Sequence, residues 1–213
     1  MTKHDPDAIA HIHNELHSHL PSEPALRVKA LESLLVEKGM LDSSAVDAWI
    51  DFYSEEIGPK CGAKIVARAW IDADFKARLL ADAKDALKEL DFDGNHLRAI
   101  ENTDTVHNIV VCTLCSCYPL WLLGIPPNWY KTAAYRSRAV RDPRGVLEEF
   151  GVALSDDIQV KVWDSTAELR YLVVPQRPAG TEDWGEARLA GLVTRNSMIG
   201  TERDLSKYMA EAG

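Results

Sequence analysis

Three of the four cysteines lie in one short segment, Cys112-Thr113-Leu114-Cys115-Ser116-Cys117. The C-x-x-C-x-C spacing lets all three sulfurs turn toward one point, because a tight turn brings neighbouring side chains and backbone amides together. A pocket of several soft thiolates selects a transition metal over calcium or magnesium. The segment is too short to keep every backbone amide away from such an ion, so the amide nitrogens of Ser116 and Cys117 become candidate ligands. We therefore predict a transition-metal site.

The cysteines alone leave several kinds of site open. A structural zinc site takes four ligands, usually from two pairs, but Cys61 is a single cysteine far upstream and His107 is the nearest imidazole. An iron–sulfur cubane also takes four cysteines. A thioredoxin-type motif needs C-x-x-C at a helix start, which the third cysteine and Pro119 fit poorly. The remaining alternative is a group of unligated cysteines buried in a strand and turn.

Two runs of sequence extend this pattern, Val-Cys-Thr-Leu-Cys-Ser-Cys-Tyr-Pro at 111–119 and Gly-Ile-Pro-Pro-Asn-Trp-Tyr-Lys at 124–131. Both runs resemble the metal loop of the nitrile hydratase alpha subunit and the residues just after it. The resemblance extends over residues 24–203. Its other blocks are Arg27–Glu32, Gly58–Pro59, Gly62–Lys64, Glu101–Thr103, Tyr135–Arg138, Val162–Ser165 and Pro175–Thr181.

The resemblance implies a ligand set for a low-spin trivalent ion. By position, the sulfurs are those of Cys112, Cys115 and Cys117, and the two deprotonated amides are those of Ser116 and Cys117. Water or substrate takes the sixth position. The family pattern also implies that Cys115 is oxidised to sulfinate and Cys117 to sulfenate, and it places Cys115, Ser116 and Cys117 at the reacting centre. Thr113 favours Co(III) over Fe(III), since family members with Thr at this position tend to hold cobalt.

The activity that the resemblance implies is a hydro-lyase reaction, the hydration of a nitrile to its amide. A trivalent ion assists it as a Lewis acid. In the family, a beta-type partner, as one chain or two split chains, supplies two arginines that hold the oxidised sulfurs. We therefore expect this chain alone to carry metal with little or no activity. Its own basic cluster is interpreted as surface charge that pairs with the partner or with Glu148 and Glu149, and the alternative is that the cluster itself supplies such donors. That cluster comprises Arg136, Arg138, Arg141 and Arg144.

Two departures from the family pattern concern the substrate pocket. After the last cysteine the family usually reads Tyr-Pro-Trp-Pro, whereas Leu120 and Trp121 stand after Pro119 here, which makes them pocket candidates. Asp93 falls where many members place a glutamine near the site, although an acidic turn residue before Gly94 is the alternative. These departures favour a bulky heteroaromatic nitrile. The alternatives are the cobalt-carrying gamma subunit of thiocyanate hydrolase and, more distantly, a non-catalytic metal- or redox-binding module.

An α+β fold is expected to position the loop. We predict an N-terminal helical arm over 1–58, a compact layered α/β/β/α domain over 59–204 that carries the metal loop, and a polar tail over 205–213. Apolar residues at helical spacing predict two helices in the arm, from Ser22 to Gly39 and from Ser43 to Ile57. The resemblance favours an arm that wraps the partner subunit.

The second domain contains both periodicities, so both element types are expected there. The strand before the cysteines delivers its end directly into the loop. The polar chain from Thr201 is expected to fray. The expected elements are a helix over 74–90, strands over 96–100 and 106–111, a helix from Asp142-Pro143 to Phe150-Gly151, and a hairpin of 158–162 with 169–174.

Composition restricts the class of protein further. The 213 residues suffice for one sizeable domain and an arm, and a net charge of −9 argues against a nucleic-acid partner. No apolar run suggests a membrane span, and the start of the chain lacks a signal-peptide pattern. Clustered cysteines indicate a metal site in a reducing compartment, so we expect a cytoplasmic protein.

The first twenty residues are rich in histidine. His13 and His17 are four residues apart, but glutamate does not directly follow the first of them as the zinc-protease motif requires. A polar helical tail is the favoured interpretation, and adventitious metal binding is the alternative. The histidines are His4, His11, His13, His17 and His19.

Overall fold

The computed structural model describes residues 23–52, 58–92, 94–115 and 117–212. The histidine-rich start, the end of the second arm helix, Asp93 and Ser116 lie outside these ranges. Internal contacts divide the chain into two units, residues 1–50 and 51–213. Within the described ranges, no helix has both the length and the apolar character of a membrane span.

The first unit contains the two predicted helices, α2 (Glu23–Glu37) and α3 (Ser43–Asp51). Gly39 ends the first at φ +67°, a left-handed conformation that favours glycine. Asp42 precedes the second, and its carboxylate accepts from the Ser44 amide at 2.9 Å. Neither helix buries a single residue within this chain. Two amphipathic helices therefore present their apolar side chains to the outside.

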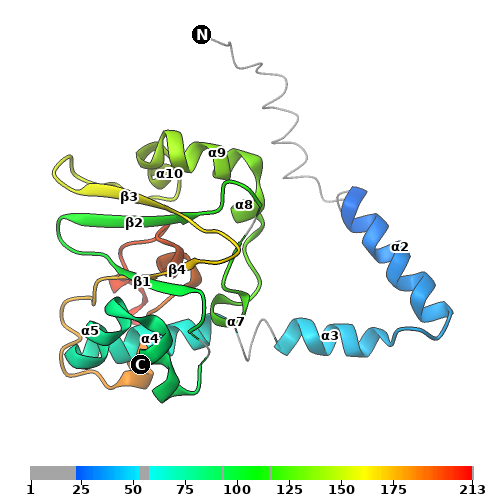
Figure 1. The fold of residues 1–213 in the computed structure, drawn as a ribbon, viewed down its shortest axis with the longest axis horizontal. Helices are drawn as coiled ribbons and strands as arrows, with labels where there is room; N and C mark the ends of the chain where they lie inside the picture. Colours follow the sequence, from blue (N-terminus) through cyan, green and yellow to red (C-terminus); the bar gives the residue numbers. More distant parts are fainter. Residues whose placement is uncertain (1–22, 53–57, 93, 116, 213) are drawn as a thin grey trace, which may run out of the picture. The chain divides into compact units, whose positions relative to one another are not determined.

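Among the described residues of the second unit, four strands form two parallel pairs (Figure 1). In one sheet β1 (Leu97–Glu101) pairs with β4 (Arg170–Val174), and in the other β2 (Val106–Val111) pairs with β3 (Gln159–Asp164). The predicted strands before the cysteine loop are confirmed to within a residue.

The predicted hairpin of 158–162 with 169–174 is wrong, because β3 and β4 belong to different sheets. Alternating polarity identifies a strand but not its partner. Residues Tyr171–Val174 of β4 are buried without interruption, as is usual for a parallel strand that is covered on both faces. Strand β2 of the other sheet and helices of this unit contact β4 and provide that cover.

Helices cover the outer faces of the two sheets (Figure 1). On the β1–β4 side, α4 (Gly58–Ile71) lies against β4, and α5 (Ala73–Ala81) and α6 (Ala83–Leu87) lie against β1. On the β2–β3 side, α9 (Ala133–Arg141) contacts β2 and α10 (Pro143–Glu149) contacts β3. The predicted α+β class and its α/β/β/α layering are therefore confirmed.

The predicted helix over 74–90 is divided at Asp82. The Asp82 backbone N–H ends α5 on the Arg78 carbonyl, and its carboxylate accepts from the amides of Lys84 and Asp85 to begin α6. Aspartate favours such positions because its short side chain competes for backbone donors. A 3-10 turn, η2 (Lys88–Leu90), follows. The helix predicted after Asp142 is confirmed as α10, capped by the Asp142 carboxylate on the Gly145 amide at 3.0 Å.

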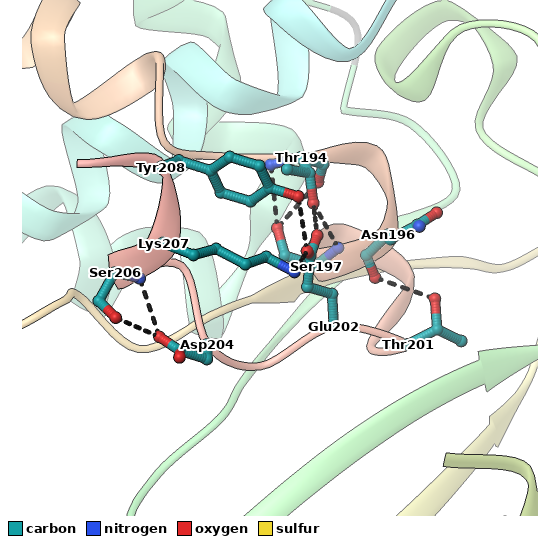
Figure 2. A network of polar contacts seen from close by, with 9 residues as sticks. All are labelled: Thr194, Asn196, Ser197, Thr201, Glu202, Asp204, Ser206, Lys207 and Tyr208. Carbon is teal, nitrogen blue, oxygen red and sulfur yellow. Dashed lines mark hydrogen bonds and ion pairs between the residues drawn. The ribbon is translucent and has the colours of Figure 1, made fainter. Parts of the chain in front are cut away.

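The prediction that the chain frays from Thr201 is wrong. The buried Glu202 carboxylate accepts from the Thr194 hydroxyl before α12 (Arg195–Ile199), from Tyr208 at 2.8 Å and from Lys207 at 2.6 Å (Figure 2). Both donors of the tail, Lys207 and Tyr208, lie in η3 (Ser206–Tyr208). Further on, Arg188 of α11 (Glu186–Ala190) donates to the Ala212 carbonyl at 2.8 Å. A satisfied buried carboxylate thus holds the C-terminal segment on the domain.

Candidate metal centre

The cysteine loop begins where two parallel strands end. β2 ends at Val111, directly before Cys112, and Val111 is in register with Asp164, the last residue of β3. Parallel neighbours have their carboxyl ends at the same edge of the sheet, so the loop and Asp164 meet there. Cys112 is buried at 1% exposure, Cys117 is half-buried and Cys115 is exposed.

The three cysteine sulfurs lie together. The Sγ atoms of Cys112 and Cys115 are 3.4 Å apart, those of Cys115 and Cys117 are 3.0 Å apart, and all three lie within 4.8 Å of one another. This is the one group of potential metal ligands of its kind among the described residues. Three converging soft donors fit a transition metal.

Without a cation the Cys117 thiol holds its proton. Hydrogen bonding with the Cys115 side chain, followed by burial and the Cys112 thiol, raises the pKa of Cys117 to about 12. A second thiolate beside a first is disfavoured in the same way. Metal binding through Cys117 must therefore displace this proton from its sulfur.

Asp164 holds the first residue of the turn on its amide side. The Thr113 N–H donates to Asp164 Oδ1 at 2.9 Å, and the Thr113 hydroxyl donates to Oδ2 at 2.6 Å. Hydrogen bonds to a carboxylate are about twice as strong as neutral ones. The side chain that favours cobalt in the sequence pattern is thereby fixed in one orientation.

Arg136 holds the same turn on its carbonyl side. Its Nη2 donates to the Thr113 oxygen at 3.0 Å and to the Leu114 oxygen at 3.4 Å. The interpretation of the four arginines as surface charge is confirmed for Arg138, which pairs with Glu149 at 2.7 Å. It is wrong for Arg136, because helix α9 carries residue 136 against the loop and residue 138 toward α10.

Two tyrosines donate hydrogen bonds to the backbone of the cysteine loop and of the strand that leads into it. Tyr130 donates to the Cys117 carbonyl at 3.0 Å, and Tyr135 donates to the Val110 carbonyl at 2.7 Å. Burial raises the pKa of both phenols, so they stay protonated and remain donors. Tyr130 comes from the short helix α8 (Asn128–Lys131), and its ring packs edge-on against Tyr118 with centroids 5.1 Å apart.

The pocket candidates lie at the start of α7 (Leu120–Leu123), three residues after the last cysteine. Leu120 is 39% exposed, and the partly buried Trp121 has its ring centroid 6.4 Å from that of Phe92. This contact brings the segment before Asp93 beside α7, while Asp93 itself is not among the described residues. Leu114, in the loop, is 84% exposed.

Asp164, Arg136 and Tyr130 are site residues that the sequence patterns did not identify, and Arg136 was interpreted as surface charge. Each lies in a block that carries the resemblance, within Val162–Ser165, Tyr135–Arg138 or the run 124–131. The signal was therefore present, but only the fold shows that these distant blocks meet at the cysteine loop.

A comparison with known protein families agrees with the interpretation of the cysteine loop. The family profile described as nitrile hydratase, alpha chain, matches residues 22–202. The chain belongs to the nitrile hydratase alpha-chain family. The resemblance found in the loop is thereby confirmed.

Individual relatives of this family cover most of the chain. It is 57% identical to the low-molecular weight cobalt-containing nitrile hydratase subunit alpha of Rhodococcus rhodochrous, over 88% of this chain and 94% of that one. It is 54% identical to the cobalt-containing subunit alpha of Pseudonocardia thermophila, over 86% and 92%. Thiocyanate hydrolase subunit gamma of Thiobacillus thioparus is 40% identical, over 80% and 76%.

The fold agrees with solved structures of the family. A double mutant of the Fe-type nitrile hydratase from Comamonas testosteroni Ni1 aligns with a TM-score of 0.76 at 42% identity. The alignment covers 86% of this chain and 91% of that one. The layered domain with its loop at the strand ends is therefore the fold of this family.

Proposed function

We propose that this chain is the metal-carrying alpha subunit of a nitrile hydratase, a lyase that hydrates a nitrile to its amide. The observation that carries the proposal is the convergence of three cysteine sulfurs within 4.8 Å at the joint end of β2 and β3. Unligated structural cysteines would not need to meet, and the exposed Cys115 contributes nothing to a core.

The proposed ligands are the sulfurs of Cys112, Cys115 and Cys117 with the backbone amides of Ser116 and Cys117. We propose Co(III) as the ion, because Thr113 stands in the loop and relatives at 54–57% identity are named as cobalt-containing. Fe(III) is the alternative, since an Fe-type enzyme shares the fold at 42% identity. Elemental analysis separates the two.

The ion would supply Lewis acidity to the nitrile or to water. The chain's own residues supply the rest. We propose that Cys115 carries a sulfinate and Cys117 a sulfenate, and that the Cys117 oxygen accepts the proton of the water whose oxygen bonds to the nitrile carbon. That proton then passes to the nitrile nitrogen, which gives the imidic acid, and transfer of the remaining O–H proton to the nitrogen gives the amide. Tyr130 holds the backbone of Cys117, which keeps this oxygen in place relative to the loop.

A beta-type partner, of one chain or two, is proposed to complete the site with arginines. The sulfur of Cys115 is exposed here, and exposed apolar side chains stand in and after the loop at Leu114 and Leu120. The Arg136 Nη2 donor is already engaged by loop carbonyls. We also propose residues 1–58 as the partner-wrapping arm, 59–204 as the catalytic domain and 205–213 as a polar tail.

The substrate is proposed to be a bulky heteroaromatic nitrile, with Leu120, Trp121 and Asp93 as pocket residues. The flat indole of Trp121 beside Phe92 offers a surface on which an aromatic ring can stack. Thiocyanate is the second candidate, because a thiocyanate hydrolase subunit is 40% identical to this chain. We also propose a cytoplasmic location, since a cluster of thiols persists in reducing compartments.

Co-expression with a beta-type subunit tests the function. Elemental analysis should find one cobalt per alpha chain, and mass spectrometry should find about three added oxygens on the peptide that holds Cys112 to Cys117. Amide should form only in the complex. Carbonyl sulfide and ammonia from thiocyanate would support the second candidate. A complex that holds zinc or no metal, or full activity in the isolated chain, would overturn the proposal.

A further inference from the structure

Arg136 differs from the other arginines of its segment because its carbonyl partners, Thr113 and Leu114, belong to the cysteine loop. Arg138 pairs with Glu149, and Arg144 donates to the carbonyls of Leu154, Ser155 and Ile158. Arg136 has no carboxylate within ion-pair distance among the described residues. Its Nε is buried and finds no acceptor in the described part of the chain. A partly desolvated guanidinium without an acid needs another source of negative charge.

That source is the cysteine turn. Nη2 of Arg136 donates to the Leu114 carbonyl at 3.4 Å, and the same peptide unit carries the Cys115 N–H, which donates to Cys112 Sγ at 3.3 Å. A donor at the carbonyl end polarises the whole peptide and strengthens the bond made by its N–H. The guanidinium therefore acts on the Cys112 sulfur through one peptide unit.

A second hydrogen bond fixes the geometry of this relay. Nη2 also donates to the Thr113 carbonyl at 3.0 Å, while Asp164 accepts from the Thr113 amide and hydroxyl on the opposite side. Thr113 is thus held between a cation and an anion, and the Leu114–Cys115 peptide is fixed in its orientation. Hydrogen bonds behind a ligand atom orient it and tune the metal.

We propose that Arg136 is a positioning residue of the metal centre. Through the Leu114–Cys115 peptide it strengthens the hydrogen bond to Cys112 Sγ and orients this sulfur, and so sets both metal loading and the electronic character of the sulfur–metal bond. The proposal rests on the metal-carrying function proposed above. It assigns to this chain a cation that acts from within the subunit, separate from the arginines expected of the partner.

The test compares Arg136→Met, Arg136→Lys and Arg138→Met in complexes co-expressed with the beta-type subunit at limiting cobalt. Arg138→Met is the matched control, because it removes the same charge from a half-buried side chain two residues along α9, where the guanidinium pairs with Glu149. Cobalt per chain, the sulfur-to-cobalt absorption band, kcat and KM are measured. We expect Arg136→Met to weaken cobalt retention about tenfold and to shift the band. Arg136→Lys should restore most of the loading with an intermediate band, and Arg138→Met should match the wild type.

Wild-type loading and wild-type absorption in Arg136→Met would overturn the proposal. If Arg136→Met does not assemble, Arg136→Lys decides, since a band unchanged from the wild type would show that the guanidinium does not act on the sulfur. An equal loss of cobalt in Arg138→Met would show that the effect comes from surface charge and would also overturn the proposal. A wild-type complex without cobalt would instead overturn the proposed function itself, which keeps the two failures distinguishable.

Discussion

At the scale of single residues, the chemistry of this protein lies in Cys112, Cys115 and Cys117. Their sulfurs converge because the loop between them has only a few residues and starts at the rigid end of β2. Asp164 and Arg136 then fix the two sides of Thr113. The supporting residues use charged hydrogen bonds, which hold a turn more firmly than neutral ones.

Cys115→Ala should abolish metal binding, because it removes the sulfur that lies between the other two. Cobalt per chain in the complex with the beta-type subunit, measured by elemental analysis, should fall by at least about tenfold. Cys61→Ala is the control, since this half-buried cysteine on α4 lies outside the cluster and should leave cobalt unchanged. Full cobalt loading in Cys115→Ala would show that the ligand assignment is incorrect.

His107 makes stability depend on pH. Burial lowers its pKa below the ordinary 6.5, and its Nε2 lies 2.7 Å from the Gly200 carbonyl, which suits a neutral ring that donates there. As pH falls below 6.5 the unfolded chain binds a proton that the folded chain refuses, so stability is lost. The loss should approach about 1.4 kcal/mol per pH unit below 6.5, until the folded-state pKa is reached.

Urea unfolding between pH 7.5 and 5 measures this effect, with His107→Gln for comparison. The variant should be less stable at neutral pH, yet its stability should fall less steeply between pH 6.5 and 5.5. Parallel slopes in the two proteins would assign the acid sensitivity to other groups.

At the scale of elements, the decisive fact is which strands pair. β2 and β3 run parallel in register, so their carboxyl ends deliver Cys112 and Asp164 to one place. The segment at Gly200 crosses close to β2, where it accepts from His107. That close approach fixes the strand that carries the loop, and only a glycine permits it.

Gly200→Ala should strongly destabilise the domain. Gly200 has φ +93°, and a Cβ there would collide with the Asn108 carbonyl oxygen of β2. Gly151→Ala is the matched control, because Gly151 has φ +79° with open space around it. We expect a loss of about 1–2 kcal/mol at Gly151 from the left-handed backbone alone, and at least about 2 kcal/mol more at Gly200 from overpacking. Thermal or urea unfolding measures both, and equal losses would argue against the collision.

At the scale of the whole molecule, the chain presents surfaces that it does not itself bury. Helices α2 and α3 bury none of their residues, and even large apolar side chains are open: Leu31 is 61% exposed and Trp49 is 60% exposed. Large exposed apolar residues at helical spacing mark an interaction surface. Together with the open cysteine cluster, they agree with the proposal that the functional unit is a heteromer.

Leu31→Ser and Trp49→Ser should weaken assembly with the beta-type subunit by about tenfold each, as expected for anchors that lose about 1.4 kcal/mol. Titration of the partner, followed by size-exclusion chromatography, measures this. Glu32→Ser on the same helix is the control and should assemble normally, and all three variants should bind cobalt as the wild type does once assembled. Unchanged assembly of the Leu31→Ser and Trp49→Ser variants would show that the arm is not part of the interface.

The sequence by itself determined the local features of this protein: the cysteine loop and its family, the amphipathic helices, the four strands and the aspartate that caps α10. Each of these depends on residues within a few positions of one another, so spacing and residue type suffice. Only the tertiary structure decided that β3 and β4 part into different sheets, that Glu202 anchors the C-terminal segment, and that Asp164 and Arg136 hold Thr113. The bonds of Asp164 and Arg136 to Thr113 join residues 51 and 23 positions apart, and the sheets choose between possible strand partners. The partners of Glu202 are near in sequence, but they bond to it as they do because folding buries its carboxylate. These contacts depend on which side chains the whole fold buries, and the pattern of neighbouring residues does not contain that information.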